Sequence, residues 1–505
     1  MKTAISSLFF SMIFVLCCGS SVVAENKNID AEFLYKKSCA ECHGTDRLGA
    51  MGPALLPQNL KRLKKKAAIS VIENGSPATQ MPAFHDKLSK AEIQSLVEYI
   101  YTPLKRIPEW GMEQIRASHI VYHRPEQLPD KPLFSADLQN LFIVVELADH
   151  HATLLDGDTF IPIHRFPTRF ALHGGPKYSN NGRYVFFASR DGWISKFDIY
   201  NLKYVAEIRA GINTRNMAVS SDGRYVVVAN YLPHTLTVLD GRDLTPLRVI
   251  PVTDNNGHSS RVSAVYAAEP RKSFIVALKD IPEVWEISYS TLASAIKTPP
   301  PIRRIKTDDY LDDFFLNPDY SLIIGTSRSG SSQLVDLNLG KVVHKLDLPG
   351  MPHLGSGITW QYRDRPVLAT PNMKEGVVSI IDMTTWKTIK RIDTLGPGFF
   401  MRSHENSPYA WVDVFFGPDR DAMHIIDKRT LKIVKTLRPV PGKVSAHVEF
   451  TKDGSRALLS IWDKEGALIV YDSRTLKELK RIPMRKPSGK YNVHNKLTRS
   501  SGTSH

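Results

Sequence analysis

Short apolar segments alternate with polar turns along the chain from about residue 135 onward. Each unit holds two or three apolar residues, an acidic residue, a few polar residues and a second apolar segment. The acidic residues recur at intervals of 42 to 50: Asp156, Asp198, Asp240, Glu286, Asp336, Asp382, Asp427 and Asp472. Hairpin-type turns such as Asp222-Gly223 lie between them. A period of about 45 with about four short strands per unit is typical of a propeller blade, so residues 135–505 are predicted to form an all-β, eight-bladed propeller.

A helical period precedes these repeats. Ser89 and Glu92 are spaced as a capping box. Apolar residues then follow at helical spacing until Pro103 ends the pattern: Ile93, Leu96, Val97 and Ile100. Residues 25–105 are therefore predicted to form a small all-α domain, and residues 106–134 a linker to the propeller.

The first residues have the pattern of a signal peptide. Lys2 precedes an apolar run over residues 5–16, and Val22-Val23-Ala24 fits the small-x-small rule for cleavage. The run is too short to span a membrane, and the bulky residues before Cys17 speak against a lipoprotein. Later segments also fall short of the roughly 18 apolar residues of a membrane helix. We expect residues 1–24 to be removed on export, and a mature periplasmic protein with no membrane span.

Composition narrows the classes of partner. The 505 residues are 42% hydrophobic and 23% charged, with a net charge of +15. This indicates a folded globular protein that favours anionic partners. No nucleic-acid-binding motif accompanies the charge, so we expect no nucleic acid. The basic run at residues 61–66 is either a solvated face or a contact for an acidic redox partner.

Redox chemistry is indicated by the segment Cys39-Ala40-Glu41-Cys42-His43. C-x-x-C-H is typical of heme c attachment, in which two thiols bind the vinyl groups and the histidine ligates iron. A chance match or a redox cysteine pair is the alternative, but these two cysteines are the only ones left after the expected cleavage. Met81 lies where a small cytochrome c has its sulfur ligand, with Met51 and His85 as competitors.

A heme c domain followed by an eight-bladed propeller resembles the cytochrome cd1 family over nearly the whole mature chain. Ala171-Leu172-His173 is similar to the family's proximal segment, which implies that His173 ligates the iron of a noncovalent d1-type heme. Met351-Pro352-His353 resembles the distal segment, and whether His353 ligates iron or only lines the distal face stays open. A d1 heme carries several carboxylates, so cations are expected around it, although each arginine by itself has an ordinary surface cation as its alternative. The residues expected to bind it are Arg190, Arg215, Tyr231, Arg261 and Trp462.

Two enzyme classes share this architecture in the family. Nitrite reductases form nitric oxide, and dihydro-heme d1 dehydrogenases oxidise a propionate of the d1 precursor to an acrylate. The reductases have two distal histidines, whereas here the first falls in residues 310–315, which contain none. An aspartate there is anionic and repels nitrite. Residues 25–38 are also too few for the N-terminal arm that brings a tyrosine into the reductase pocket.

His447 and Tyr491 favour the dehydrogenase. An imidazole suits removal of a proton from the propionate, whereas a structural loop histidine is the alternative for His447. Tyr491 lies in residues 487–493, which resemble a C-terminal signature of the family, and is expected to orient the carboxylate. We therefore predict a dihydro-heme d1 dehydrogenase with His447, Tyr491 and His353 as catalytic residues. A nitrite reductase and a noncatalytic electron-transfer propeller are the alternatives.

The cofactors and partners follow from this assignment. The expected iron ligands are His43 and Met81 for covalent heme c, and His173 and His353 for heme d1 or its dihydro precursor. Electrons are expected to pass to heme c and then to a soluble periplasmic electron-transfer protein. Nitrite reductase or other d1-assembly proteins are further candidate partners.

Overall fold

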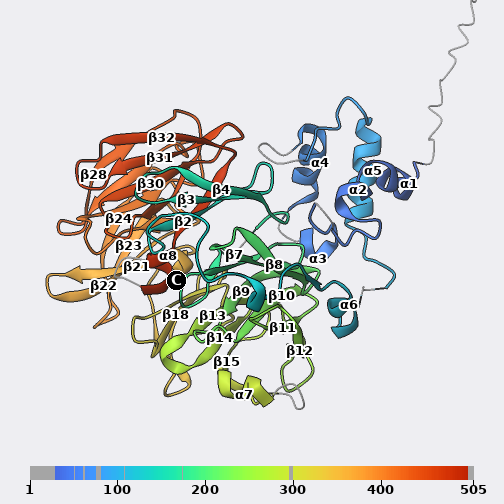
Figure 1. Cartoon of the computed structure of the whole chain (residues 1–505), viewed down its shortest axis with the longest axis horizontal. Helices are drawn as coiled ribbons and strands as arrows, with labels where there is room; N and C mark the ends of the chain where they lie inside the picture. Colours follow the sequence, from blue (N-terminus) through green and yellow to red (C-terminus); the bar gives the residue numbers. More distant parts are fainter. Residues whose placement is uncertain are drawn as a thin grey trace, which may run out of the picture.

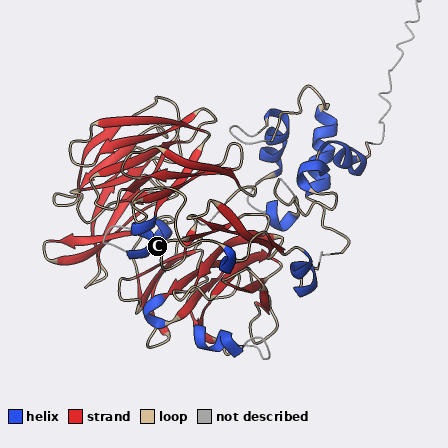
Figure 2. Ribbon diagram, viewed as in Figure 1, coloured by secondary structure: helices blue, strands red, loops and turns tan. Residues whose placement is uncertain are grey.

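The computed structural model describes residues 29–49, 52–60, 63–75, 81–106, 109–172, 175–294 and 300–498. Helices gather in the N-terminal part, and strands form most of the remainder (Figures 1 and 2). The expected signal peptide, residues 1–24, lies outside the described residues. Within the described ranges, no helix has the length and apolar character needed to cross a membrane.

The N-terminal domain is built from short helices whose apolar faces meet. These are α1 (Ala31–Ser38), α2 (Ala40–His43), α3 (Pro57–Leu60), α4 (Lys65–Asn74) and α5 (Lys90–Ile100). The capping box predicted at the start of α5 is present, and the Glu92 carboxylate accepts the Ser89 N–H at 2.8 Å. The predicted apolar face of α5 is buried, with Ile93 only 1% exposed. This packing gives α2, which carries Cys42 and His43, a rigid support.

Residues 106–134 were expected to form a linker, and their described part from residue 109 onward is folded against the propeller. They contain α6 (Met112–Ala117), β1 (Ile120–Val121) and the 3-10 helix η1 (Pro125–Gln127). β1 pairs antiparallel with β8, with Ile120 opposite Glu207. A strand of two residues is too short for hydrophobic alternation to indicate it in the sequence.

Counted over the described residues, the strands of the propeller form eight antiparallel sheets. From the innermost strand outward, the first three sheets are β33 (Pro487–Asn492), β2 (Leu141–Glu146), β3 (His151–Asp156) and β4 (Pro162–Pro167); β5 (Lys177–Tyr178), β6 (Tyr184–Ala188), β7 (Trp193–Asp198) and β8 (Lys203–Arg209), which β1 extends; and β9 (Asn213–Val219), β10 (Tyr225–Leu232), β11 (Thr235–Asp240) and β12 (Pro246–Pro251). The next three sheets are β13 (Val262–Ala268), β14 (Ser273–Leu278), β15 (Glu283–Ser288) and β16 (Arg303–Lys306); β17 (Asp313–Leu316), β18 (Leu322–Thr326), β19 (Ser332–Asp336) and β20 (Lys341–Lys345); and β21 (Ile358–Tyr362), β22 (Arg365–Pro371), β23 (Val377–Asp382) and β24 (Thr388–Asp393). The last two sheets are β25 (Met401–Arg402), β26 (Tyr409–Asp413), β27 (Met423–Asp427) and β28 (Lys432–Leu437); and β29 (Ser445–Phe450), β30 (Arg456–Ile461), β31 (Gly466–Asp472) and β32 (Glu478–Met484). Short helices add to these at η2 (Glu269–Arg271), α7 (Tyr289–Ser294), η3 (Leu354–Ser356) and α8 (Val493–Thr498).

The acidic residue of the sequence repeat marks the end of the third strand in most blades. Asp156 ends β3, and its carboxylate accepts the N–H of Asp158 at 2.8 Å. Asp472 ends β31 and accepts the N–H of Thr475 at the same distance. Such carboxylate-to-backbone bonds fix the turn into the outermost strand. Glu286 departs from the rule, because it lies inside β15 and pairs with Arg271 at 2.8 Å.

The hydrophobic core lies between neighbouring blades. In one cluster, Val227 of β10 packs with Phe274 of β14 and Trp285 of β15, so two sheets share a single apolar layer. The ring closes within one sheet, where β33 from the C-terminus pairs with β2 and places Tyr491 opposite Ile143. The eight innermost strands therefore surround a common axis.

The helical domain is held to the propeller by an apolar cluster and by Arg209. Ala54 and Leu56 belong to the same cluster as Ile212 and Leu232 of the propeller. The Arg209 guanidinium donates to the carbonyl of Leu48 at 2.6 Å and to that of Asp191 at 2.8 Å. It also lies 4.7 Å from the ring centroid of Trp110. These contacts fix the loop after α2 against the end of the propeller where the inner strands begin.

Arg209→Ala should loosen the contact between the domains. Hydrogen bonds from a charged donor contribute about 1.5–3 kcal/mol each, so cleavage that requires separation of the domains should become about tenfold faster or more. Limited proteolysis of residues 101–119 measures this rate, and Arg474→Ala on an exposed turn is the matched control. Equal cleavage rates in the two variants would contradict the assigned role of Arg209.

Candidate functional site

The C-x-x-C-H segment consists of the residue that joins α1 to α2 and of α2 itself. Cys39 follows α1, Cys42 and His43 lie in α2, and neither cysteine forms a disulfide among the described residues. The His43 ring is buried, and its Nδ1 atom lies 2.8 Å from the carbonyl oxygen of Pro53. A carbonyl only accepts, so Nδ1 carries the proton and Nε2 keeps a lone pair for a metal. Gly52 packs directly against this ring.

The candidates for the sixth iron ligand differ in their surroundings. Met81 is half-buried and packs against the apolar cluster of the helical domain, with Phe84 and Ile93 among its members. His85 is exposed, and its ring contacts the Glu73 carbonyl at 2.9 Å and the Asp86 carboxylate at 3.2 Å. Met51 lies outside the described residues. Of the two candidates that can be compared, Met81 has the apolar environment that suits a thioether ligand.

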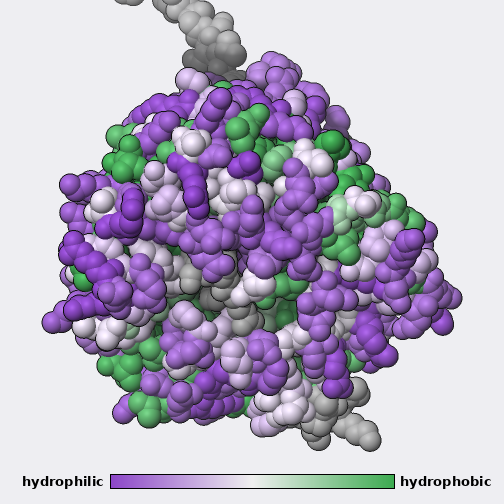
Figure 3. All heavy atoms as spheres, turned by 60° about the vertical axis from the view of Figure 1, so that its left-hand side comes forward, coloured by the Kyte–Doolittle hydropathy of each residue, from purple (hydrophilic) through white to green (hydrophobic). Residues whose placement is uncertain are grey.

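The inner strands enclose a cavity of about 280 Å³ on the axis of the propeller. Figure 3 shows a surface that is hollowed near the centre of the face it presents. Every blade contributes to the lining, through Lys177, Arg215, Tyr266, Asp313, Ser356, Arg402, His447 and Tyr491. We call this cavity the axial channel.

His447 projects into the axial channel because the sheet is interrupted at this residue. A β-bulge between Ala446 and Val448 leaves His447 without a partner in β30, and its φ of 53° is left-handed. Lys490 Nζ donates to the His447 carbonyl and, at 2.7 Å, to Ser460 Oγ. Burial and then the charge of Lys490 hold the pKa of His447 well below its ordinary 6.5, so the ring is neutral at neutral pH.

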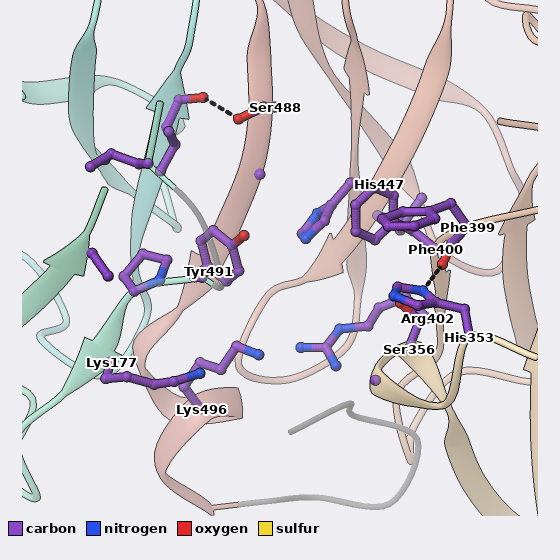
Figure 4. Close-up of a pocket in the computed structure, with 18 of the residues that line it drawn as sticks. Lys177, His353, Ser356, Phe399, Phe400, Arg402, His447, Ser488, Tyr491 and Lys496 are labelled. Carbon is purple, nitrogen blue, oxygen red and sulfur yellow. Dashed lines mark hydrogen bonds between the residues drawn. The ribbon is translucent and has the colours of Figure 1, made fainter. Parts of the chain in front are cut away.

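Tyr491 faces His447 across the channel (Figure 4). The two ring centroids are 5.2 Å apart in an edge arrangement. Gly489 leaves room for this phenol, since a Cβ there would lie 2.5 Å from its oxygen. Burial raises the pKa of Tyr491 to about 12, so the phenol keeps its proton. Among the described residues, the Nδ1 atom of His447 is buried with no hydrogen-bond partner, so this edge of the imidazole is open to a ligand.

His353 lies on another side of the axial channel, next to Asp313. Its Nδ1 atom is 2.5 Å from the Phe399 carbonyl, to which it must donate, so Nε2 keeps a lone pair. Nε2 is 3.8 Å from an Asp313 carboxylate oxygen. Burial lowers the pKa of His353, with Arg215 acting in the same direction and Asp313 against it. His353 is therefore a neutral imidazole with a nitrogen available to iron.

Aromatic side chains form a wall between His353 and His447. The Phe399 ring stacks on His353 with centroids 4.0 Å apart, and Phe400 contacts His447 at 4.8 Å. Trp462 lies against Phe400 and donates its indole N–H to the Ser488 carbonyl at 2.8 Å. Such a wall suits a flat, apolar macrocycle.

Other residues expected at the d1 site line a second cleft, of about 770 Å³, between the two domains. Arg190, Tyr231 and Arg261 face Pro53 and Ala54 of the helical domain across it. The Arg261 guanidinium is already paired with Asp280, with Nε at 2.9 Å from the carboxylate. The Tyr231 hydroxyl is buried and finds no hydrogen-bond partner among the described residues. The structure thus separates these three residues from the axial channel.

All but one of the remaining residues expected at the d1 site lie among the described residues. Arg215, Trp462, His353, His447 and Tyr491 are brought together in the axial channel. His173, the expected proximal ligand, lies outside the described residues.

Comparisons with known proteins show the family of the chain. The family model described as "Cytochrome D1 heme domain" matches residues 136–496. The chain belongs to this cytochrome d1 heme domain family. A second model, described as "Cytochrome C oxidase, cbb3-type, subunit III", matches residues 29–100. The resemblance and the fold class expected from the sequence are both confirmed.

Relatives across the cytochrome d1 heme domain family cover nearly the whole chain. A dihydro-heme d1 dehydrogenase of Pseudomonas aeruginosa is 54% identical over 484 residues, which is 96% of this chain and 97% of that protein. A nitrite reductase of Stutzerimonas stutzeri is 26% identical over 540 residues, with 94% of each chain covered. A solved structure described as dihydro-heme d1 dehydrogenase NirN in complex with DHE has a TM-score of 0.87 at 55% identity, covering 92% of this chain and 99% of that one. The expected enzyme class, an oxidoreductase, and the expected cofactors, heme c and a d1-type heme, are confirmed.

The residues of both sites fit the groups that the family implies. Cys39, Cys42 and the Nε2 atom of His43 supply two thiols and one iron ligand for heme c. The axial channel combines an imidazole with a free nitrogen, an aromatic wall and several cations, which suits an iron tetrapyrrole that carries carboxylates.

Sequence reasoning missed three cations of the axial channel: Lys177, Arg402 and Lys496. Lys496 lies beyond the last strand, in α8, where a basic residue near a chain end is usually solvated. The position of Lys177 or Arg402 relative to the repeated acidic residue does not show whether the side chain faces the channel or the surface. Their convergence depends on the closure of the ring.

Gly52→Ala should disturb the iron ligand in the helical domain. A Cβ at this position would lie 2.7 Å from Cε1 of His43, so the imidazole must tilt away from its hydrogen bond to Pro53. We expect a changed heme c spectrum and a shifted reduction potential, measured by optical redox titration. Gly111→Ala is the control, because its nearest neighbour would be 3.6 Å away. Identical reduction potentials for Gly52→Ala and the unaltered protein would show that a Cβ at position 52 does not displace the His43 ring.

Proposed function

We propose that the protein is a periplasmic dihydro-heme d1 dehydrogenase that oxidises a propionate side chain of dihydro-heme d1 to an acrylate. The reaction converts –CH₂–CH₂–COO⁻ into –CH=CH–COO⁻ and releases two protons and two electrons. The observation that carries the proposal is a neutral, buried imidazole that faces a phenol in a channel lined by cationic and aromatic side chains. The relative of that name, with 54% identity over nearly the whole chain, supports it.

His447 is the base in this proposal. A general base must have a free lone pair within reach of the proton that it removes. The bulge aims the ring into the channel, and its lowered pKa keeps the ring unprotonated. The Phe400 ring at 4.8 Å shields the imidazole from water on one side. One C–H bond of the propionate breaks and its proton passes to His447, which releases it to solvent. The proton of the second C–H bond then leaves by the same route.

Tyr491 holds the substrate side chain against this base. Its raised pKa means that the hydroxyl donates a hydrogen bond and does not itself remove a proton. The hydroxyl lies next to Gly489, whose missing side chain leaves the space that the phenol occupies. Binding through the phenol keeps the reacting carbon near the imidazole, as proximity requires.

His353 ligates the substrate iron in this proposal, with His173 as the expected ligand on the opposite face. The Phe399 carbonyl fixes the tautomer of His353 and aims Nε2 at the channel. The conjugated macrocycle of the substrate then carries the two electrons away from the side chain.

Heme c, when bound, supplies a one-electron acceptor. The Pro53 carbonyl holds His43, and Pro53 also lines the cleft to the propeller, so the iron ligand is tied to the interdomain contact. We propose that a soluble periplasmic electron-transfer protein takes the two electrons one at a time. Nitrite reductase or another d1-assembly protein would then receive the finished heme d1. The signal-peptide pattern and the heme c motif support the periplasmic location.

The alternative functions fit the channel less well. In a nitrite reductase, the Asp313 carboxylate, 3.8 Å from His353, would repel the anionic substrate. An electron-transfer propeller without catalysis needs neither a base in a bulge nor a phenol opposite it. The dehydrogenase explains both groups.

His447→Ala should bind dihydro-heme d1 with little loss of affinity but convert it 10²–10⁴-fold more slowly, because a positioned base is lost. Anaerobic single-turnover spectroscopy separates binding from conversion. His344→Ala, on the exposed outer strand β20, is the control. Conversion by the His447 variant at the unaltered rate, or brisk nitrite reduction by the unaltered protein without precursor conversion, would overturn the assignment.

The protonation of His447 should not limit conversion above about pH 6. The pKa of His447 is well below 6.5, so the base is already unprotonated there, and the rate should fall only at lower pH as the ring gains its proton. Single-turnover rates between about pH 5 and pH 8 measure this profile. A rate that rises with a midpoint near 6.5 or above would show a base with an ordinary pKa instead.

A further inference from the structure

Three cationic side chains from distant parts of the chain meet at one end of the axial channel. Lys177 begins β5, Arg402 ends β25 and Lys496 lies in α8. In Figure 4 the ends of Lys496 and Arg402 face each other below His447 and Tyr491, with Lys177 beside Lys496. We call these three side chains the cationic floor.

The like charges of the cationic floor oppose one another. Burial, then Arg402 and also Lys177, hold the pKa of Lys496 well below its ordinary 10.5, while Glu449 acts in the opposite direction. Arg402 is tied to Glu449 at 2.6 Å, in a pair that is almost fully buried. A fold that holds cations this close favours an anion between them.

The cationic floor also limits how far a ligand can extend. Lys177 and Lys496 line a second cavity, of about 470 Å³, on the far side of the floor. Tyr266 lines both cavities as well. The lysines thus form a partition, and a side chain that enters the channel past Tyr491 ends at it.

We propose that Lys177 and Lys496, together with Arg402, bind the carboxylate of the propionate that is oxidised and thereby select that propionate among the carboxylates of the substrate. This inference rests on the proposed dehydrogenase function and names the specificity determinant of the same site. The floor lies next to His447 and Tyr491, so a carboxylate held there places its own CH₂ groups beside the base.

The charge of the floor also assists the reaction. Negative charge develops on carbon as the C–H bond breaks, and a neighbouring carboxylate anion opposes it. Ion pairs with the buried lysines offset the carboxylate charge, and such interactions are stronger in a buried site than in water. A bound carboxylate opposes the effect of burial on the pKa of both lysines and so favours their protonated forms. Both protons leave in turn through His447 to solvent, and the two electrons leave through the macrocycle to heme c and the external one-electron acceptor.

Lys177→Met and Lys496→Met test this role because methionine keeps a flexible, unbranched apolar chain but removes the charge. The probes are dihydro-heme d1 and its methyl ester at the reacting propionate. With the acid, each variant should convert about 10–100-fold more slowly, as expected for a lost charged hydrogen bond. Lys496→Arg should restore most of the rate, and Lys435→Met, on the exposed face of β28, should change nothing.

The ester distinguishes a binding site from a merely structural role. In the unaltered protein, the ester should bind more weakly and react more slowly than the acid. In the methionine variants this preference should shrink toward one, because groups that interact have nonadditive effects. An acid-over-ester preference of unchanged size in both variants would overturn the proposal. The binding preference, measured by spectral titration, remains decisive even where no conversion occurs, so it separates failure of this inference from failure of the dehydrogenase assignment.

Discussion

The pairing of β33 with β2 is the contact on which the axial channel depends. It joins residues 487–492 to residues 141–146 and places Tyr491 opposite Ile143. A slip of one residue would turn Tyr491 away from the channel and Lys490 into it, because successive side chains of a strand point to opposite faces. The hydroxyl of Tyr178, in the neighbouring blade, donates to the Tyr491 carbonyl at 2.8 Å and secures this register. The strand pairing that closes the ring therefore also places the phenol.

Buried charge is concentrated around the same strand. Lys490 is fully buried, and it donates to the His447 carbonyl and to Ser460. Buried ions are costly unless they are hydrogen-bonded, so this lysine is retained where it supports the bulge. Glu449 accepts from Arg402 and from Asn495 of α8 at 3.1 Å. One carboxylate thus connects β25, β29 and the helix that carries Lys496.

The fold was largely predictable because its signals are local. The acidic repeat reflects turn hydrogen bonds that each blade makes within itself, as at Asp156 and Asp472. The heme c segment is likewise contiguous, so Cys39, Cys42 and His43 were identified together. The channel was predictable only where single residues resembled a family pattern, as at His353. Lys177 and Lys496 are more than 300 positions apart in sequence, and no local pattern indicates that ring closure brings them together. The same reason explains why Arg190, Tyr231 and Arg261 were placed with the channel residues: sequence similarity did not show that the helical domain covers them.

The bulge at position 447 allows the reactive side chain to vary without a change in the fold. Because this residue takes no part in the strand ladder, its side chain can be exchanged without altering the pairing of β29 with β30. The left-handed backbone restricts the exchange mainly to residues that tolerate a φ of 53°, such as glycine, asparagine, aspartate and histidine. Substitution at such a position can change the chemistry at the centre of the propeller, within a narrow set of residue types, while the scaffold stays the same.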